Sequence, residues 1–277
     1  GAAAESFQYA DVAELLPEPA GESDKYRRGV LGVVAGSARY PGAAVLAVAG
    51  ALHGGAGAVR YVGPAADAVL ARFPETLVSA GPPRKAGRVQ AWVVGPGLGE
   101  DASGLADVLA ADVPVLIDAD GLRLADRDAV RGRTAPTLLT PHAGEAAALL
   151  GTERAEVEAR RLWAVRELAQ RYGATVLLKG STTLVADPGS GTPVRVNPTG
   201  TPWLATAGSG DVLSGLAGSL LAAGLTARDA ASAGAHVHGL AARLAARGAP
   251  VSAQDVAAAI PAAWRDVREE AAPPGAR

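Results

Sequence analysis

Residues 30–62 read VLGVVAGSARYPGAAVLAVAGALHGGAGAVRYV, and this stretch indicates the class of fold. Its first six residues are apolar or glycine and stop at Gly36-Ser37, as expected for a buried strand. A turn at residues 40–42 leads into small and aliphatic residues that predict a helix over 43–53, and residues 58–62 predict a second strand. Strand, helix and strand in this order form a βαβ unit with parallel strands.

Further short aliphatic runs predict the rest of a central sheet, and they occupy residues 91–94, 113–117, 137–139 and 175–178. The runs are continuously apolar, which is typical of strands covered on both faces. One helix is expected over 154–171, a hairpin over 182–186 and 194–196, and long helices of small residues from Val212 and about Ala227. The sequence therefore predicts an α/β fold with three layers: a mostly parallel central sheet with helices on both faces.

The chain shows no linker-like change of composition and no repeat, so we expect one domain over residues 1–277. The first 25 or so residues, as far as Arg28, are rich in Ala, Glu and Pro and are expected to wind over the surface. Residues after Arg265 are polar and rich in Pro and Gly, and we expect a frayed tail there.

Composition excludes several classes of function. Hydrophobic residues make up 49% of the chain, and the formal net charge of −2 gives no electrostatic footprint for nucleic acid or an anionic membrane. The absence of cysteine removes disulfides, thiolate metal sites and thiol catalysis. No secretory signal and no apolar stretch of membrane-spanning length is visible, so a cytoplasmic protein with small-molecule or protein partners is expected.

The clearest chemical signal is Gly208-Ser209-Gly210-Asp211, between a loop at residues 197–207 and the small-residue helix that follows. Two glycines let the backbone turn tightly and approach a ligand closely, and the first N–H groups of a helix can face one anion. Asp211 lies beside them as a possible base, so this motif predicts transfer of a phosphoryl group to an oxygen. A plain helix start is the alternative, since acidic residues favour helix N-termini.

A second glycine-rich motif, Gly95-Pro96-Gly97-Leu98-Gly99, directly follows the predicted strand at residues 91–94. Ligands of open parallel sheets bind beyond the carboxyl ends of strands, where these glycines fall. Their spacing does not match G-x-G-x-x-G, and no G-x-x-x-x-G-K-[ST] occurs, so Rossmann and P-loop sites are disfavoured. A structural turn is the alternative.

The third motif, Thr140-Pro141-His142-Ala143-Gly144-Glu145, also follows a predicted strand. His142 and Glu145 are expected to face the same end of the sheet. Direct metal ligation by His142 is disfavoured, because the chain has only four histidines and no third ligand lies nearby in sequence. Glu145 is the better candidate to hold a magnesium ion through water, since Mg²⁺ prefers oxygen ligands and keeps several waters.

Three weaker signals remain. Lys179-Gly180-Ser181-Thr182-Thr183 suits nucleotide phosphates or ribose, although a surface loop has the same composition. Asp118 and Asp120 follow another strand and could order magnesium or a substrate hydroxyl, or cap a helix. His236 and His238 lie two residues apart in a predicted helix and face different sides, so we interpret them as core or surface histidines.

The order and wording of these motifs resemble one protein family. The set comprises Gly36-Ser37 with YPGAA at residues 40–44, then GPGLG at 95–99, DADGL at 118–122, TPHAGE at 140–145, KGSTT at 179–183 and GSGDVL at 208–213. Together they resemble the ADP-dependent NAD(P)H-hydrate dehydratases of the ribokinase-like superfamily, over about residues 25–245. The resemblance implies a repair lyase that restores NADH or NADPH from the hydrated S-form, using ADP and magnesium and giving AMP and phosphate through a phosphorylated intermediate.

The resemblance also assigns residues. Hydrate contacts are implied at Ala43, Gly99, His142 and Asp211, and nucleotide contacts at Lys179, Gly180, Ser181, Thr182, Thr183 and Gly210. Asp211 would act as the base, with the N–H groups of Ser209, Gly210 and Asp211 as an anion hole. A homotetramer is implied, and only the dehydratase activity is expected, because the additional N-terminal epimerase domain of some relatives is not seen in this sequence.

Two other functions stay open. A kinase of the same superfamily, acting on a hydroxymethylpyrimidine or hydroxyethylthiazole, would use the same glycine and aspartate loop, although many such kinases have asparagine in place of His142. A non-catalytic nucleotide sensor would need the glycines and Lys179 but not Asp211. The sequence does not decide between ADP and ATP, or between the hydrates of NADH and NADPH.

Overall fold

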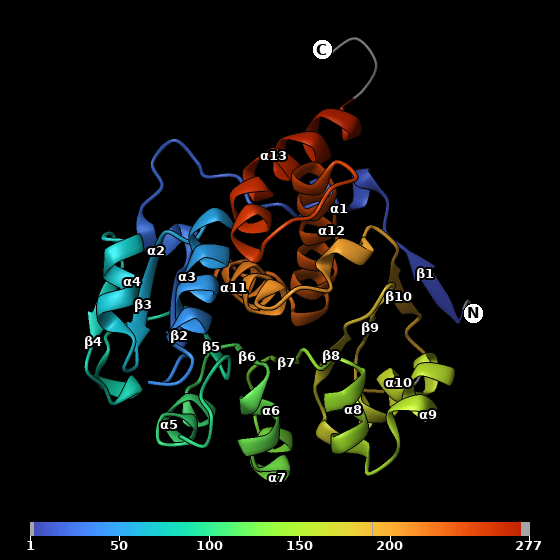
Figure 1. Ribbon diagram of the computed structural model, residues 1–277, viewed down its shortest axis with the longest axis horizontal. Coiled ribbons are helices and arrows are strands. Elements are labelled where there is room, and N and C mark those ends of the chain that lie inside the picture. Colours follow the sequence, from blue (N-terminus) through green and yellow to red (C-terminus); the bar gives the residue numbers. More distant parts are fainter. Residues whose placement is uncertain (1–2, 190, 273–277) are drawn as a thin grey trace.

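The computed structural model describes residues 3–189 and 191–272, and within them ten strands form one sheet. The strand order is β1-β10-β9-β8-β7-β6-β5-β2-β3-β4. All neighbours run parallel except β9, which is antiparallel to both β8 and β10 (Figure 1). The strands are β1 (Ala4–Ser6), β2 (Val30–Val34), β3 (Ala58–Val62), β4 (Leu77–Ser79), β5 (Ala91–Val94), β6 (Val115–Ile117), β7 (Thr137–Leu139), β8 (Thr175–Leu178), β9 (Thr183–Ala186) and β10 (Val194–Asn197).

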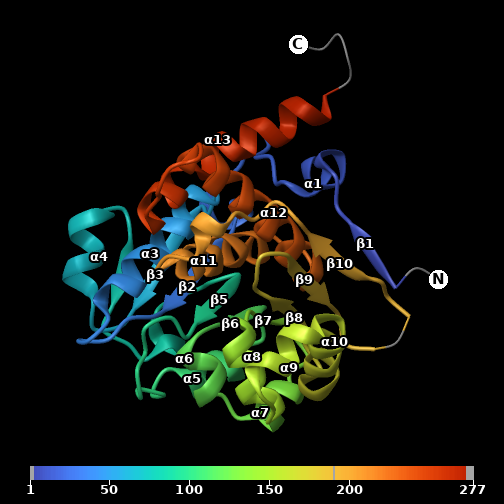
Figure 2. The same ribbon diagram turned by 45° about the vertical axis from the view of Figure 1, so that its right-hand side comes forward.

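Helices cover both faces of the sheet (Figures 1 and 2). One face carries α1 (Tyr9–Leu15), α3 (Pro41–His53), α11 (Ser209–Ala222), α12 (Ala227–Ala246) and α13 (Ala253–Ala271). The other carries α5 (Leu105–Ala110), α6 (Asp120–Leu124), α7 (Arg127–Arg131), α8 (Ala143–Leu150), α9 (Arg154–Ala159) and α10 (Arg161–Tyr172). The remaining helices are α2 (Lys25–Arg28), α4 (Ala66–Arg72) and 3-10 turns at Pro83–Lys85 and Pro202–Leu204.

An apolar core lies on each face of the sheet, and this explains the continuously apolar strands. Along β5, for example, Val93 packs into the core beneath α3 and α11, whereas its neighbour Val94 packs into the core beneath α5 to α10. Successive side chains of a strand point to opposite faces, so both faces need apolar residues. The predicted three-layer fold, the parallel sheet and the hairpin of β9 and β10 are confirmed.

Helices α3 and α11 lie side by side with their backbones in contact (Figure 2). A methyl group on Gly50 would lie 2.1 Å from the carbonyl oxygen of Val212, and one on Gly215 would lie 1.9 Å from that of Ala47. These positions therefore accept only glycine, which accounts for the small-residue composition of both helices. The close contact fixes the start of α11 relative to α3, and both helices begin at the carboxyl edge of the sheet.

The helix expected over residues 154–171 is two helices. Arg160 has φ −132° and ψ 49°, and this non-helical residue ends α9 and precedes α10. The break gives α10 its own axis, and its first residue, Arg161, contacts the loop after β8.

The two ends of the chain pack into the fold more than the sequence predicts. Near the N-terminus, β1 extends the sheet beside β10, and α1 buries Val12 completely. Near the C-terminus, α13 was not expected as a helix, and it continues to Ala271 with Val267 buried and Arg268 donating to the carbonyl of Leu16. The frayed tail predicted after Arg265 is thus wrong as far as residue 271, because these residues pack against α1, and residues 273–277 lie outside the described residues. None of the helices described is long and apolar enough to span a membrane.

Candidate active site

The predicted functional loops share the carboxyl edge of the sheet. Strands β2, β5, β6, β7 and β8 are mutually parallel, so the residues that follow them lie along one edge. Backbone hydrogen bonds join neighbouring loops there: Gly36 donates to the carbonyl of Pro96 over 2.7 Å, and Lys179 donates to that of Pro141 over 2.9 Å. The motifs that the sequence places after predicted strands therefore meet at one edge of the sheet.

The start of α11 requires glycine. Gly208, the N-cap residue, has φ 88°, a left-handed conformation that favours glycine. A methyl group there would also lie 2.3 Å from Cδ1 of Leu46 on α3. Packing against α3 therefore fixes the turn that presents the next three residues.

Two of the three predicted anion-binding N–H groups have no hydrogen-bond acceptor among the described residues. The Ser209 N–H lies 3.4 Å from the carbonyl oxygen of Thr206, a long hydrogen bond. Among the residues described, no protein atom accepts a hydrogen bond from the N–H of Gly210 or Asp211. The first turn of α11 can thus donate two N–H groups, reinforced by the helix dipole, to an anion.

A buried ion pair links this turn to β8. The ammonium Nζ of Lys179 lies 2.9 Å from Oδ1 of Asp118, whose side chain is 1% exposed. The other oxygen of Asp118, Oδ2, accepts a hydrogen bond of 2.6 Å from the hydroxyl of Ser214 on α11. Burial alone would lower the pKa of Lys179, but the carboxylates of Asp118, Glu145 and Asp211 outweigh it and raise that pKa. Lys179 therefore stays protonated at neutral pH.

Asp211 has the proton affinity of a base near neutrality. Burial, followed by the negative charge of Asp118, raises the pKa of its carboxyl to about 7, against the lowering effect of Lys179. Glu145 and Asp120 raise it further. An isolated aspartate, with a pKa near 4, would be a much weaker base.

His142 and Glu145 form the N-terminal cap of α8. Nδ1 of His142 accepts from the N–H groups of Gly144 and Glu145 over 3.0 and 3.1 Å, and Oε2 of Glu145 accepts from the N–H of His142 over 2.9 Å. The two side chains hold each other at the sheet edge, with Nε2 of His142 3.3 Å from Oε1 of Glu145. The His142 ring is 57% exposed, so it can contact a ligand.

Asp120 holds the glycine loop after β5. Its Oδ2 accepts a hydrogen bond of 2.8 Å from the N–H of Gly99. In the same loop, a methyl group on Gly97 would lie 2.5 Å from Cβ of Ala43, at the start of α3. The structure thus packs Ala43 against the loop that contains Gly99, and both residues were expected to contact the hydrate.

Arg161 shapes the loop at residues 179–183 from beneath. Its guanidinium donates to the carbonyls of Thr182 and Leu178 over 2.8 and 3.2 Å and lies 2.7 Å from where a methyl group on Gly180 would be. These contacts draw carbonyl oxygens inward, and a side chain at position 180 would have to displace the Arg161 guanidinium.

Comparison with known proteins agrees with this geometry. The family model described as NAD(P)H-hydrate dehydratase matches residues 31–262 of the chain. The chain belongs to the NAD(P)H-hydrate dehydratase family. It is 44% identical over 261 residues to the ADP-dependent (S)-NAD(P)H-hydrate dehydratase of Neisseria meningitidis serogroup B, which covers 89% of this chain and 87% of that protein.

Two further members of the NAD(P)H-hydrate dehydratase family are similar. The chain is 54% identical over 245 residues to the bifunctional NAD(P)H-hydrate repair enzyme Nnr of Mycobacterium leprae, a match covering 87% of this chain but 50% of that protein. It thus spans about half the length of that relative. The chain also resembles the crystal structure of the ADP/ATP-dependent NAD(P)H-hydrate dehydratase of Bacillus subtilis co-crystallised with ATP/Mg²⁺, with a TM-score of 0.84 at 28% identity. The match covers 94% of this chain and 97% of that chain.

Several residues that organise this site were not predicted from the sequence. Arg161 was expected only as part of a helix, and Ser214 and Arg243 were not singled out. Arg243 on α12 donates to the carbonyl of Gly200 over 2.8 Å and so holds the loop before α11. Long-range contacts of this kind leave no local signature in one sequence.

His236 and His238 are both buried, as core histidines. Nε2 of His238 lies 2.9 Å from the carbonyl oxygen of Ser209, and burial lowers the pKa of this histidine to about 4. Because the ring is neutral and the carbonyl can only accept, Nε2 carries the hydrogen. His238 therefore supports the start of α11 from below.

Helix capping, one of the two alternatives for the aspartates after β6, is wrong. Neither caps α6, whose N-cap is Ala119, because Asp118 is engaged by Lys179 and Ser214 and Asp120 by Gly99. Across residues 3–189 and 191–272, no group of three or more His, Cys, Asp or Glu residues could hold a metal ion. The carboxylates acting on Asp211 outnumber the single ammonium of Lys179, and this surplus of negative charge fits a cation held through water.

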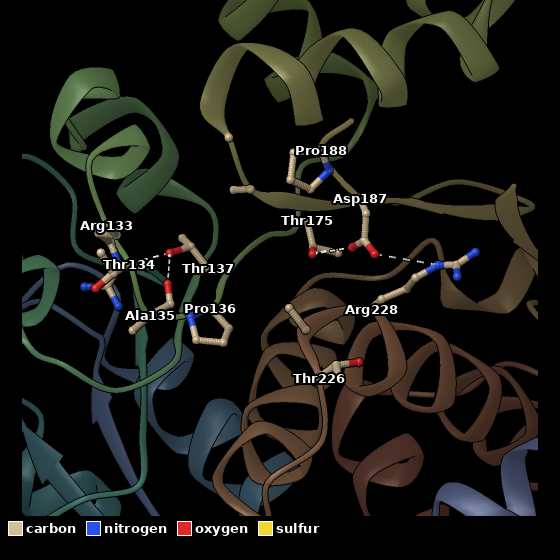
Figure 3. Close-up of a pocket in the computed structure, with 13 residues that line it drawn as sticks. Arg133, Thr134, Ala135, Pro136, Thr137, Thr175, Asp187, Pro188, Thr226 and Arg228 are labelled. Atoms are coloured by element: carbon tan, nitrogen blue, oxygen red, sulfur yellow. Dashed lines mark hydrogen bonds and ion pairs between the residues drawn. The ribbon is translucent and has the colours of Figure 1, made fainter. Parts of the chain in front are cut away.

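A separate pocket of about 280 Å³ lies at the opposite edge of the sheet (Figure 3). Thr137 and Thr175, the first residues of β7 and β8, line it together with Asp187 and Arg228. Thr175 donates to Asp187 over 2.6 Å, and Arg228 lies 4.0 Å from the same carboxylate. Nε of Arg228 is buried and has no hydrogen-bond partner among the described residues. The predicted site residues all lie elsewhere.

Proposed function

We propose that the chain is an ADP-dependent (S)-NAD(P)H-hydrate dehydratase, which restores NADH or NADPH from the S-form of the hydrate. The observation that carries the proposal is Asp211, with a pKa of about 7, at a helix start whose N–H groups and neighbouring Lys179 can bind a phosphoryl group. The 44% identity to the Neisseria meningitidis enzyme of that name supports the assignment.

The proposed reaction has two steps. In the first, the hydroxyl oxygen of the hydrate attacks the β-phosphorus of ADP, the bond from that phosphorus to the bridging oxygen breaks, and AMP leaves. Asp211 accepts the hydroxyl proton, and the N–H groups of Gly210 and Asp211 with the ammonium of Lys179 stabilise the charge on the transferring group. Ser209 contributes less, since its N–H already faces Thr206.

In the second step, the bond between the ring carbon and the phosphate oxygen breaks. The lone pair of the ring nitrogen expels phosphate, and the adjacent ring carbon loses a proton to form the double bond. Phosphate is a far better leaving group than hydroxide, which is why the hydroxyl is phosphorylated first. The products are NAD(P)H, AMP and phosphate, and no redox change occurs.

The remaining predicted residues fit roles around this reaction. Ala43, Gly99 and His142 border the carboxyl edge where the hydrate would bind, and the loop from Lys179 through Gly180, Ser181, Thr182 and Thr183 would hold the nucleotide. Glu145 would hold a magnesium ion through water, and that ion supplies charge neutralisation of the nucleotide phosphates when bound. The Bacillus subtilis relative co-crystallised with ATP/Mg²⁺ supports a magnesium nucleotide. The homotetramer and cytoplasmic location stay predictions.

Absorbance at about 340 nm tests the proposal directly, because restoring the dihydropyridine ring restores that chromophore. The protein is mixed with NADPH hydrate and Mg²⁺, with ADP, with ATP or with neither. A rise that requires ADP is expected. No rise with either nucleotide, together with phosphorylation of a small alcohol, would instead indicate a kinase.

A further inference from the structure

The single ammonium at the site is shared among several carboxylates. Lys179 responds electrostatically to Asp118, Glu145 and Asp211, and Asp120 acts on Asp211 as well. In the part of the chain that the structure describes, its ion pair is with Asp118, at 2.9 Å, and not with Asp211. Its Nζ lies beside Gly210, 3.2 Å from where a methyl group on that residue would be. The ammonium thus lies next to the base without pairing to it.

Asp118 is built to hold that position. Its side chain is 1% exposed, and both carboxylate oxygens are engaged, one by Lys179 and the other by Ser214 on the second turn of α11. The carboxylate therefore joins the end of β8 to α11 through two contacts, and it cannot follow the ammonium toward solvent.

The backbone around Asp118 is specialised as well. Ala119 has φ 51° and ψ −127°, a conformation that residues other than glycine rarely adopt. On the other side, a methyl group on Gly95 would lie 1.8 Å from the carbonyl oxygen of Asp118. Backbone conformations of this kind persist where the surroundings determine them, and they cluster at functional sites. The turn places Asp118 inward and Asp120 against Gly99.

We propose that Asp118 is a positioning residue for phosphoryl transfer: it fixes the ammonium of Lys179 beside the first turn of α11 and prevents that ammonium from pairing with the carboxylate of Asp211. The inference rests on the proposed function. An ion pair between Lys179 and Asp211 would occupy the carboxylate lone pairs that must accept the hydroxyl proton. It would also withdraw the ammonium of Lys179 from the phosphoryl group. Asp118 keeps base and cation apart without contacting either substrate.

The test is Asp118→Asn, which removes the charge and keeps the shape. The amide oxygen can still accept from Lys179 and its NH₂ can donate to Ser214, but the competing anion is lost, so the ammonium moves to Asp211. We expect kcat to fall roughly 10- to 100-fold, which is less than the roughly 10²–10⁴ of losing a general base outright, while KM for ADP changes less than about threefold. The acidic limb of kcat/KM should move to lower pH, because the paired base holds its proton less tightly.

Ser214→Ala is the matched control. It removes one hydrogen bond to the same carboxylate but leaves the charge of Asp118 and its pair with Lys179. The acidic limb should stay at its wild-type pH. The negative charge of Asp118 by itself raises the pKa of Asp211, so the limb of Asp118→Asn moves whether or not the ammonium does. The deciding readout is kcat on the alkaline plateau, where Asp211 is ionised. A plateau kcat in Asp118→Asn that equals the wild-type value, or that falls no further than in Ser214→Ala, would overturn the inference.

Removing one partner of a buried ion pair can unfold a protein, so a second variant is needed. Asp118→Glu keeps the charge but displaces it by one methylene, which should move the ammonium and lower kcat with little change in KM for ADP. A wild-type kcat in this variant, or in Asp118→Asn, contradicts the inference. The outcome is separable from the proposed function, which fails only if the wild-type protein gives no nucleotide-dependent rise at 340 nm.

Discussion

Replacing Gly210 by alanine should separate the stability of the protein from its activity. Gly210 is the second residue of α11 and is not among the residues with positive φ, so alanine can adopt its backbone conformation. The added methyl group would lie 3.2 Å from Nζ of Lys179, the end of a flexible side chain. Alanine is favoured over glycine within helices by about 0.5–1 kcal/mol. The free energy of unfolding should therefore stay unchanged or rise by up to about 1 kcal/mol.

Activity should respond in the opposite direction. The methyl group would project toward the ammonium of Lys179, where the transferring phosphoryl group is proposed to lie, and would keep that group from the N–H donors. Loss of one such donor typically lowers kcat by about 10²–10³. We expect Gly210→Ala to lose at least about tenfold in kcat.

The assay pairs urea unfolding with initial rates at 340 nm. Gly42→Ala is the matched control for stability, because Gly42 is the second residue of α3 and a methyl group there meets nothing within 4 Å. Wild-type kcat and ADP affinity in Gly210→Ala would show that the first turn of α11 does not approach the phosphoryl group. That result would exclude its N–H groups as the anion-binding donors.

Three further outcomes are expected. Asp211→Asn should bind ADP normally, as measured by calorimetry. Its kcat should fall by about 10²–10⁴, because an amide cannot accept the hydroxyl proton. Unchanged turnover would exclude Asp211 as the base. In the wild-type protein kcat/KM should fall as pH decreases through about 7. Below that pH the raised pKa of Asp211 leaves its carboxyl protonated and unable to act as a base. A flat profile from pH 6 to 8 would contradict this assignment. Gly215→Ala should destabilise the fold by about 1–3 kcal/mol or more in urea unfolding, because its methyl group would lie 1.9 Å from the carbonyl oxygen of Ala47. A wild-type unfolding midpoint would show that α3 and α11 can separate freely.

Much of the fold was predictable because its signals are local. The apolar runs of β2, β5, β7 and β8 are continuous, and glycines or polar residues end each of them, so strand positions and the parallel sheet followed from the pattern. The helix α13 was missed because its buried residues are mostly small alanines and Pro261 lies within it. The break at Arg160 was also missed, since it serves a contact of Arg161 with a loop distant in sequence.

The candidate site was predictable as a set of loops but not as a network. Glycines and acids at strand ends indicated which loops meet, and the family resemblance assigned their roles. The pair of Asp118 with Lys179 spans 61 residues, and the contact of Asp118 with Ser214 spans 96, so neither is visible in one sequence. For the same reason, the pKa of Asp211 could not be foreseen, because it depends on burial and on carboxylates from two other loops.

The stoichiometry of the reaction distinguishes ADP-driven dehydration from simple phosphorylation. NADPH formed from its hydrate is followed at 340 nm while AMP and phosphate are measured by ³¹P NMR in the same sample with ADP and Mg²⁺. We expect AMP, phosphate and NADPH to appear in equal amounts, and none of them to appear without the hydrate. A stable phosphorylated product without NADPH, or NADPH formed without consumption of ADP, would contradict this expectation.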